Sequence, residues 1–218
     1  MLQNQTFNRV GTNHQISANV YNLILGAVLL WGFAVNWYLV STVPADIIKA
    51  IPMLLFLAGY MITTLTGVAI IFKSEKPLYS FLGYNLIVVP IGLLLVIVLP
   101  DYSHQNIIKA VQTTALLTVG MMLLGTAFPG FFKRIEASLF IALVVAIVVE
   151  LGQAWLFGTR LAAMDWIVAA IFCGYIGVDW GRANQIERSV DNAIDSAASL
   201  YLDIINLFLR ILRIMSRK

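Results

Sequence analysis

Residues 79–99, YSFLGYNLIVVPIGLLLVIVL, form a run that contains no charged side chain. A helix that crosses the hydrocarbon core of a bilayer needs about 20 mostly apolar residues. Backbone N–H and C=O groups inside lipid must be paired, so only helices and closed barrels span it. Barrel strands instead alternate apolar and polar residues over about 10 positions. The run therefore predicts a transmembrane helix.

Similar apolar windows lie on both sides of this run. They cover residues 20–40, 51–72, 107–128, 137–157 and 165–178, and a seventh window, 193–214, is interrupted by polar residues. Only 11% of the chain is charged and 60% is hydrophobic, whereas soluble domains carry about 25% charged residues. We therefore expect an all-α integral membrane protein, a seven-transmembrane-helix bundle.

The expected domain organisation follows from these windows. Residues 1–19 form a polar N-terminal segment, residues 20–214 the transmembrane domain, and residues 215–218 a basic C-terminal tail. The N-terminal segment has no apolar core of the kind that a signal peptide requires.

Basic residues predict the orientation, because Lys and Arg gather in short cytoplasmic loops. With the N-terminus in the cytoplasm, the inside segments hold Arg9, Lys73, Lys76, Lys133, Arg134, Arg182 and Arg188, and the outside loops hold Lys49, Lys109 and Arg160. This bias favours a cytoplasmic N-terminus. The C-terminal basic residues lie outside if the seventh helix crosses fully and inside if it is re-entrant, and the sequence leaves both open.

Polar residues follow one face of the seventh window. Asp195, Ser199, Asp203, Asn206 and Arg210 are spaced 4, 4, 3 and 4 residues apart, which places them on one side of a helix. A charge inside the bilayer is costly and points to function. This stripe is expected to face the protein interior or a water-filled path, although helix–helix hydrogen bonding would give the same pattern.

Three further acids lie in or beside the apolar windows. Glu150 could line a cation path or bond to a neighbouring helix. Asp179 ends the sixth window, and Asp165, next to Trp166, is interpreted as an interfacial helix cap. Small residues also recur on the sixth helix and predict tight packing on a neighbour, the stripe helix being nearest in sequence: Ala170, Gly174, Gly177 and Gly181.

The chain carries no motif of a known enzyme class. There is no His-Glu-x-x-His, no Gly-x-Ser-x-Gly and no phosphate-binding glycine loop,. Its one cysteine, Cys173, has no partner for an internal disulfide. The net charge of +3 needs no nucleic-acid partner. We expect a non-enzyme without a cofactor, whose main partner is the lipid bilayer.

The C-terminal part of the chain resembles a known family. YIGVD at residues 175–179 and SLYLDIINLF at residues 199–208 are similar to the last two helices of the Bax-inhibitor family, the transmembrane Bax inhibitor motif proteins, bacterial branch. TTAL at residues 113–116, the pair at 133–134 and KSEKP at residues 73–77 are similar as well.

This resemblance implies a seven-helix fold with the last helix central, and a pH-sensitive calcium leak. Asp179 and Asp203 match the family's sensor pair, and Lys73 matches by position a basic residue that bonds one of them. Two close carboxylates in a low-dielectric bundle share a proton. Once ionised, they offer hard oxygen ligands suited to a transient calcium ion.

The resemblance also leaves a second function open. Bacterial relatives have been linked to regulation of another membrane protein, such as a quality-control protease, without conducting ions. Compact loops and the absence of eukaryotic targeting signals favour a bacterial inner membrane.

Overall fold

The computed structural model describes residues 15–158 and 161–217. Arg9, His14, Arg160 and Lys218 lie outside the described residues. The described residues form eight α-helices and one short 3-10 helix, and contain no strand. In chain order the elements are α2 (Ala18–Thr42), α3 (Ala45–Lys49), α4 (Met53–Lys73), α5 (Pro77–Val98), η1 (Leu99–Asp101), α6 (His104–Ala127), α7 (Pro129–Phe157), α8 (Ala162–Ala183) and α9 (Val190–Met215).

Six of these helices are long and apolar enough to cross a membrane. They are α2, α4, α5, α6, α7 and α8, which correspond to the six windows read from the sequence. The protein is therefore an integral membrane protein with several spans. The fifth window starts too late, because α7 begins at Pro129; proline suits a first helical turn, where its missing N–H has no intrahelical partner. The short helix α3 after Pro44 was not predicted.

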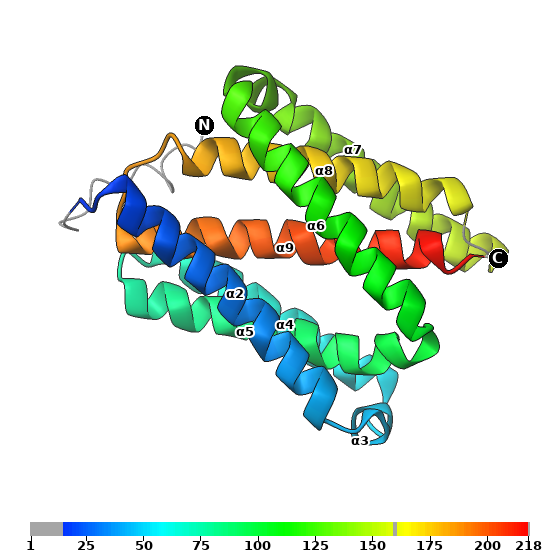
Figure 1. Cartoon of the computed structure of the whole chain (residues 1–218). Coiled ribbons are helices and arrows are strands. Elements are labelled where there is room, and N and C mark those ends of the chain that lie inside the picture. Colours follow the sequence, from blue (N-terminus) through cyan, green and yellow to red (C-terminus); the bar gives the residue numbers. More distant parts are fainter. Residues whose placement is uncertain (1–14, 159–160, 218) are drawn as a thin grey trace. The chain divides into compact units, whose positions relative to one another are not determined.

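Contacts divide the chain into two compact units. The first contains residues 1–101 and 186–198, hence α2 to α5 and the beginning of α9 (Figure 1). Within it α4 packs closely on α5, where Gly67 and Gly83 face each other. A Cβ atom built on Gly67 would lie 2.5 Å from the Gly83 carbonyl oxygen, so only glycine allows this approach. The Tyr84 hydroxyl donates to the Val28 carbonyl at 3.0 Å and joins α5 to α2.

The second unit contains residues 102–185 and 199–218, hence α6 to α8 and most of α9. Both α6 and α7 pack on α8 (Figure 1). The tight packing predicted from the small residues of α8 is confirmed, but its partners are α6 and α7. Gly174 lies against Leu139, Gly177 against Phe132, and Gly181 against the Gly125 carbonyl. The suggestion that these glycines face the last helix is therefore wrong.

Helix α9 differs from the six apolar helices in burial and polarity. It is not among the apolar spans, yet none of its residues from Val190 to Met215 is exposed. In α4 and α7, by contrast, only 11% and 6% of the most apolar window is buried. The exposed apolar surfaces of α4 and α7 are therefore the ones that suit contact with lipid.

Candidate functional site

The two aspartates singled out in the sequence lie together in the second unit. Asp179 belongs to the last turns of α8 and Asp203 to the middle of α9, and their carboxyl groups lie close enough to interact. Asp203 is 7% exposed, and the side chain of Asp179 is 12% exposed. Because an ionised carboxylate can only accept hydrogen bonds, a bond between these two groups requires one shared proton.

Arg182, which the sequence does not predict to contact this pair, completes the site. Arg182 lies one turn after Asp179, and its Nη1 is 3.2 Å from the Asp179 Oδ1. Its Nη2 donates to Oε1 of Glu136, on α7. The spacing Asp-x-x-Arg on one helix was the available signal, since residues three apart are neighbours on a helix surface. No motif or spacing in the sequence points to Glu136.

Lys73, the basic partner expected from the resemblance, ends α4 in the first unit. Its pairing with an aspartate stays a prediction. The basic group that contacts Asp179 within the second unit is Arg182.

The remaining stripe residues have different environments. The Asn206 side-chain amide donates to the Leu202 carbonyl at 2.7 Å, within its own helix. Ser199 is half-buried. Asp195 is buried and belongs to the first unit. In that unit the first turns of α9 hold a further buried acid, Asp191, which accepts from the Ser80 hydroxyl at 2.7 Å.

Glu150 forms a bidentate pair with Arg210 of α9. Nη2 of Arg210 lies 2.8 Å from Oε2 of Glu150, and Nη1 bonds to Oε1. Glu150 therefore bonds to a neighbouring helix, which is the second of the two roles predicted for it. Arg210 is the last residue of the polar stripe, so the stripe included one of the two partners in this contact.

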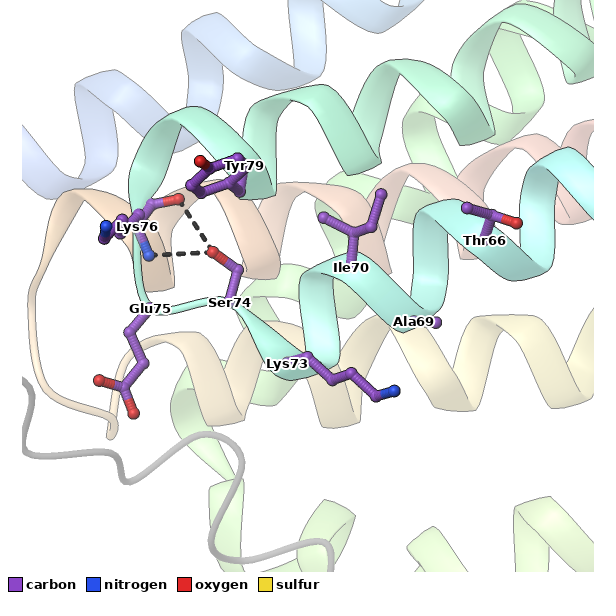
Figure 2. A pocket seen from close by; sticks show the side chains of 8 residues that line it. All are labelled: Thr66, Ala69, Ile70, Lys73, Ser74, Glu75, Lys76 and Tyr79. Atoms are coloured by element: carbon purple, nitrogen blue, oxygen red, sulfur yellow. Dashed lines mark hydrogen bonds between the residues drawn. The ribbon is translucent and has the colours of Figure 1, made fainter.

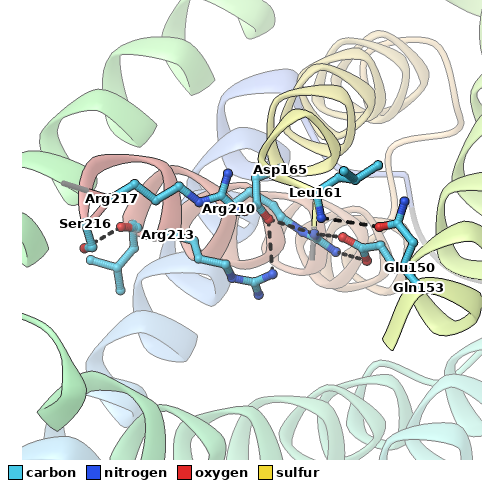
Figure 3. A network of polar contacts seen from close by, with 9 residues as sticks. Glu150, Gln153, Leu161, Asp165, Arg210, Arg213, Ser216 and Arg217 are labelled. Atoms are coloured by element: carbon cyan, nitrogen blue, oxygen red, sulfur yellow. Dashed lines mark hydrogen bonds and ion pairs between the residues drawn. The ribbon is translucent and has the colours of Figure 1, made fainter. Parts of the chain in front are cut away.

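Asp165 is the centre of a larger ion cluster, and its interpretation as a helix cap is wrong. The cap residue of α8 is Leu161, and the Asp165 side chain is only 3% exposed. Three guanidinium groups converge on it from α9 and the segment that follows (Figure 3): those of Arg210 at 3.0 Å, Arg213 at 3.1 Å and Arg217 at 2.5 Å. Its position in the first turn of α8 also favours a negative charge.

The two clusters fix the direction of α9 along α8. Asp165 lies 14 residues before Asp179 on α8, about 21 Å at 1.5 Å per helical residue, whereas its partners Arg210, Arg213 and Arg217 all follow Asp203. The two helices therefore run antiparallel within the second unit. The C-terminal basic residues lie beside the start of α8.

Known proteins resemble this chain over most of its length. The sequence model of the family described as "Inhibitor of apoptosis-promoting Bax1" matches residues 13–218. The inner membrane protein YbhL of Escherichia coli K12 is 26% identical over 92% of this chain and 91% of its own length. Protein LIFEGUARD 3 of Arabidopsis thaliana is 29% identical over 86% of this chain and 85% of its own. LIFEGUARD 4 of the same plant is 40% identical, but over 49% of this chain and 46% of its own length.

Proposed function

Because this chain belongs to the Bax-inhibitor family of membrane proteins, we propose that it is a pH-sensitive calcium leak channel or transporter, gated by Asp179 and Asp203. The observation that carries the proposal is that these two carboxyl groups, on α8 and α9, are buried and close enough to interact. The name of its relative YbhL supports a bacterial inner membrane as the location.

The shared proton is the proposed latch. While one carboxyl group is protonated, a hydrogen bond holds α9 to α8. Arg182 bonds to Asp179 and stabilises its negative charge, so we place the proton on Asp203, whose buried Oδ2 has no hydrogen-bond partner among the described residues. Loss of this proton leaves two adjacent carboxylates that repel each other. The same two oxygen-rich groups then suit a calcium ion in transit.

We further propose that α9 is a seventh, central transmembrane helix. Its 26 residues extend about 39 Å at 1.5 Å per residue, enough for a hydrocarbon core of about 30 Å. None of its charged residues is exposed, and Asp191, Arg210 and Arg213 bond to other helices, which weakens the usual objection to charge in a span. With a cytoplasmic N-terminus, the C-terminal basic residues then lie on the opposite side of the membrane.

Calcium flux into liposomes that contain the purified protein tests the gate. We expect flux to rise with pH through the range in which the shared proton is lost. Asp203→Asn and Asp179→Asn should each abolish this pH response, because neither leaves a proton to share. Asp46→Asn, which alters an exposed acid of α3, is the matched control and should respond as the wild type does. Absence of flux above empty liposomes at every pH would refute the channel and favour a non-conducting regulator.

A further inference from the structure

The turn between α4 and α5 carries a surface hollow that the proposed gate does not use. Its volume is about 620 Å³, and it lies wholly within the first unit. Figure 2 shows the lining residues: Thr66, Ala69, Ile70, Lys73, Ser74, Glu75, Lys76 and Tyr79. One end of the hollow is charged and the other is apolar.

The charged end has an excess of positive charge. Lys73 and Lys76 are both exposed, and Glu75 is the one acid in the lining. The Lys76 ammonium lies 5.9 Å from the centre of the Tyr79 ring, close enough for a cation–π contact that keeps it beside the hollow. The N-terminus of α5 begins at Pro77 and adds the positive end of a helix dipole. This end suits a phosphate group.

The shape of the turn is fixed by its own hydrogen bonds. The Ser74 hydroxyl accepts from the Lys76 backbone N–H at 3.0 Å and donates to the Lys76 carbonyl at 3.2 Å. Figure 2 shows both bonds, which hold the segment between the two lysines in one conformation. The two lysine side chains leave this turn in different directions in Figure 2, and because both are exposed they are free to turn toward one phosphate.

The apolar end runs up the membrane-facing side of α4. Ala69 and Ile70 lie one turn after Thr66 and one turn before Lys73, on the same side of α4,. The Thr66 hydroxyl donates to the Ile62 carbonyl at 2.7 Å, so its hydrogen is satisfied within its own helix. Because only 11% of the apolar window of α4 is buried, this stripe is available to a hydrocarbon chain.

We propose that the hollow binds one anionic phospholipid of the surrounding bilayer. Its phosphate lies at Lys73 and Lys76, and one acyl chain follows Thr66, Ala69 and Ile70. A free phosphate would use only the charged end and leave the apolar stripe uncovered. The orientation expected from the basic residues places this turn in the cytoplasmic leaflet, where anionic headgroups attract juxtamembrane lysines.

Native mass spectrometry of the detergent-purified protein, titrated with dioleoylphosphatidylglycerol, tests this site. Since a lysine near an anionic headgroup contributes about 1 kcal/mol, Lys76→Gln should weaken binding about fivefold and Lys73→Gln/Lys76→Gln about 25-fold. Lys109→Gln removes an exposed lysine of α6, in the second unit, and should leave the affinity unchanged. Equal losses in Lys76→Gln and Lys109→Gln would overturn the proposal, as would equal binding of dioleoylphosphatidylcholine.

A second variant separates a lipid from a free anion. Ala69→Trp keeps both lysines but fills the apolar end of the hollow, where the acyl chain would lie. It should therefore weaken phosphatidylglycerol binding. Sodium phosphate in excess should not displace the lipid. Unchanged lipid binding by Ala69→Trp, together with displacement by phosphate, would assign the hollow to free phosphate and overturn the lipid site. Because no flux is measured, the result does not depend on the proposed gate.

Discussion

Two buried charge clusters join α8 to α9, and they differ in their balance of acids and bases. At Asp179 and Asp203, with Glu136, a single guanidinium, that of Arg182, faces three carboxyl groups. At Asp165 and Glu150, three guanidinium groups face two carboxylates. Arginine does not lose its proton in proteins. The second cluster therefore keeps its ion pairs over the physiological pH range, whereas the first has a net charge of −2 when all three acids are ionised, which one bound proton lowers to −1.

This difference assigns separate roles to the two ends of the α8–α9 contact. We expect the Asp165 cluster to anchor the C-terminal end of α9 at every physiological pH. The Asp179–Asp203 pair lies about 21 Å from Asp165 along α8, and the gain or loss of a single proton can make or break it. A gating movement of α9 would then pivot about the arginine-rich end.

The largest effect is expected from Asp165→Asn. It removes a buried carboxylate that three arginines share. Breaking a buried ion pair costs about 3–5 kcal/mol, and the loss should be at the lower end because the arginines are 15–34% exposed and Arg210 keeps Glu150. The apparent Tm of the detergent-purified protein should fall strongly, and by similar amounts at pH 5.5 and 8. Asp101→Asn, in an exposed pair with Lys49, is the control and should change stability by less than about 1 kcal/mol. A fall in Tm no larger than the control's would show that this cluster does not anchor α9.

A smaller and pH-dependent effect is expected from Arg182→Gln. Hydrogen bonds to charged groups contribute about 1.5–3 kcal/mol each, and the Arg182 side chain, 27% exposed, should be at the lower end of that range. The loss in Tm should be larger at pH 8 than at pH 5.5, because protonation relieves the remaining acids. Arg182→Lys should recover part of it, since lysine keeps the charge but not the two-pronged geometry. A loss that is equal at both pH values would remove the distinction between the clusters.

Hydropathy and helical spacing predicted the helices but not the pairing of their charges. The six apolar windows follow from the cost of exposing polar backbone to lipid, which local sequence records directly. The spacing places Arg210 in a polar stripe, but it cannot identify the partner Glu150, which is 60 residues away in the chain. Asp165, beside Trp166 at the start of a window, is predicted to be a helix cap. No neighbouring residue in the sequence indicates that arginines of α9 contact it. Which helix faces meet is decided by tertiary packing, which one sequence does not show.

The smallest effect on stability is expected from Asp203→Asn, and it gives the sharpest comparison. An asparagine amide can donate to Asp179 without any shared proton, so the link between α8 and α9 survives while one buried acid is removed. Stability at pH 8 should stay within about 1 kcal/mol of the wild type or rise, because removing one of two adjacent carboxylates relieves repulsion. The same chemical change at Asp165 should be severely destabilising, so the two Asp→Asn variants measured side by side isolate the surroundings of each acid. Comparable losses at pH 8 would mean that Asp203 is ionised and firmly paired, and the shared-proton latch would have to be abandoned.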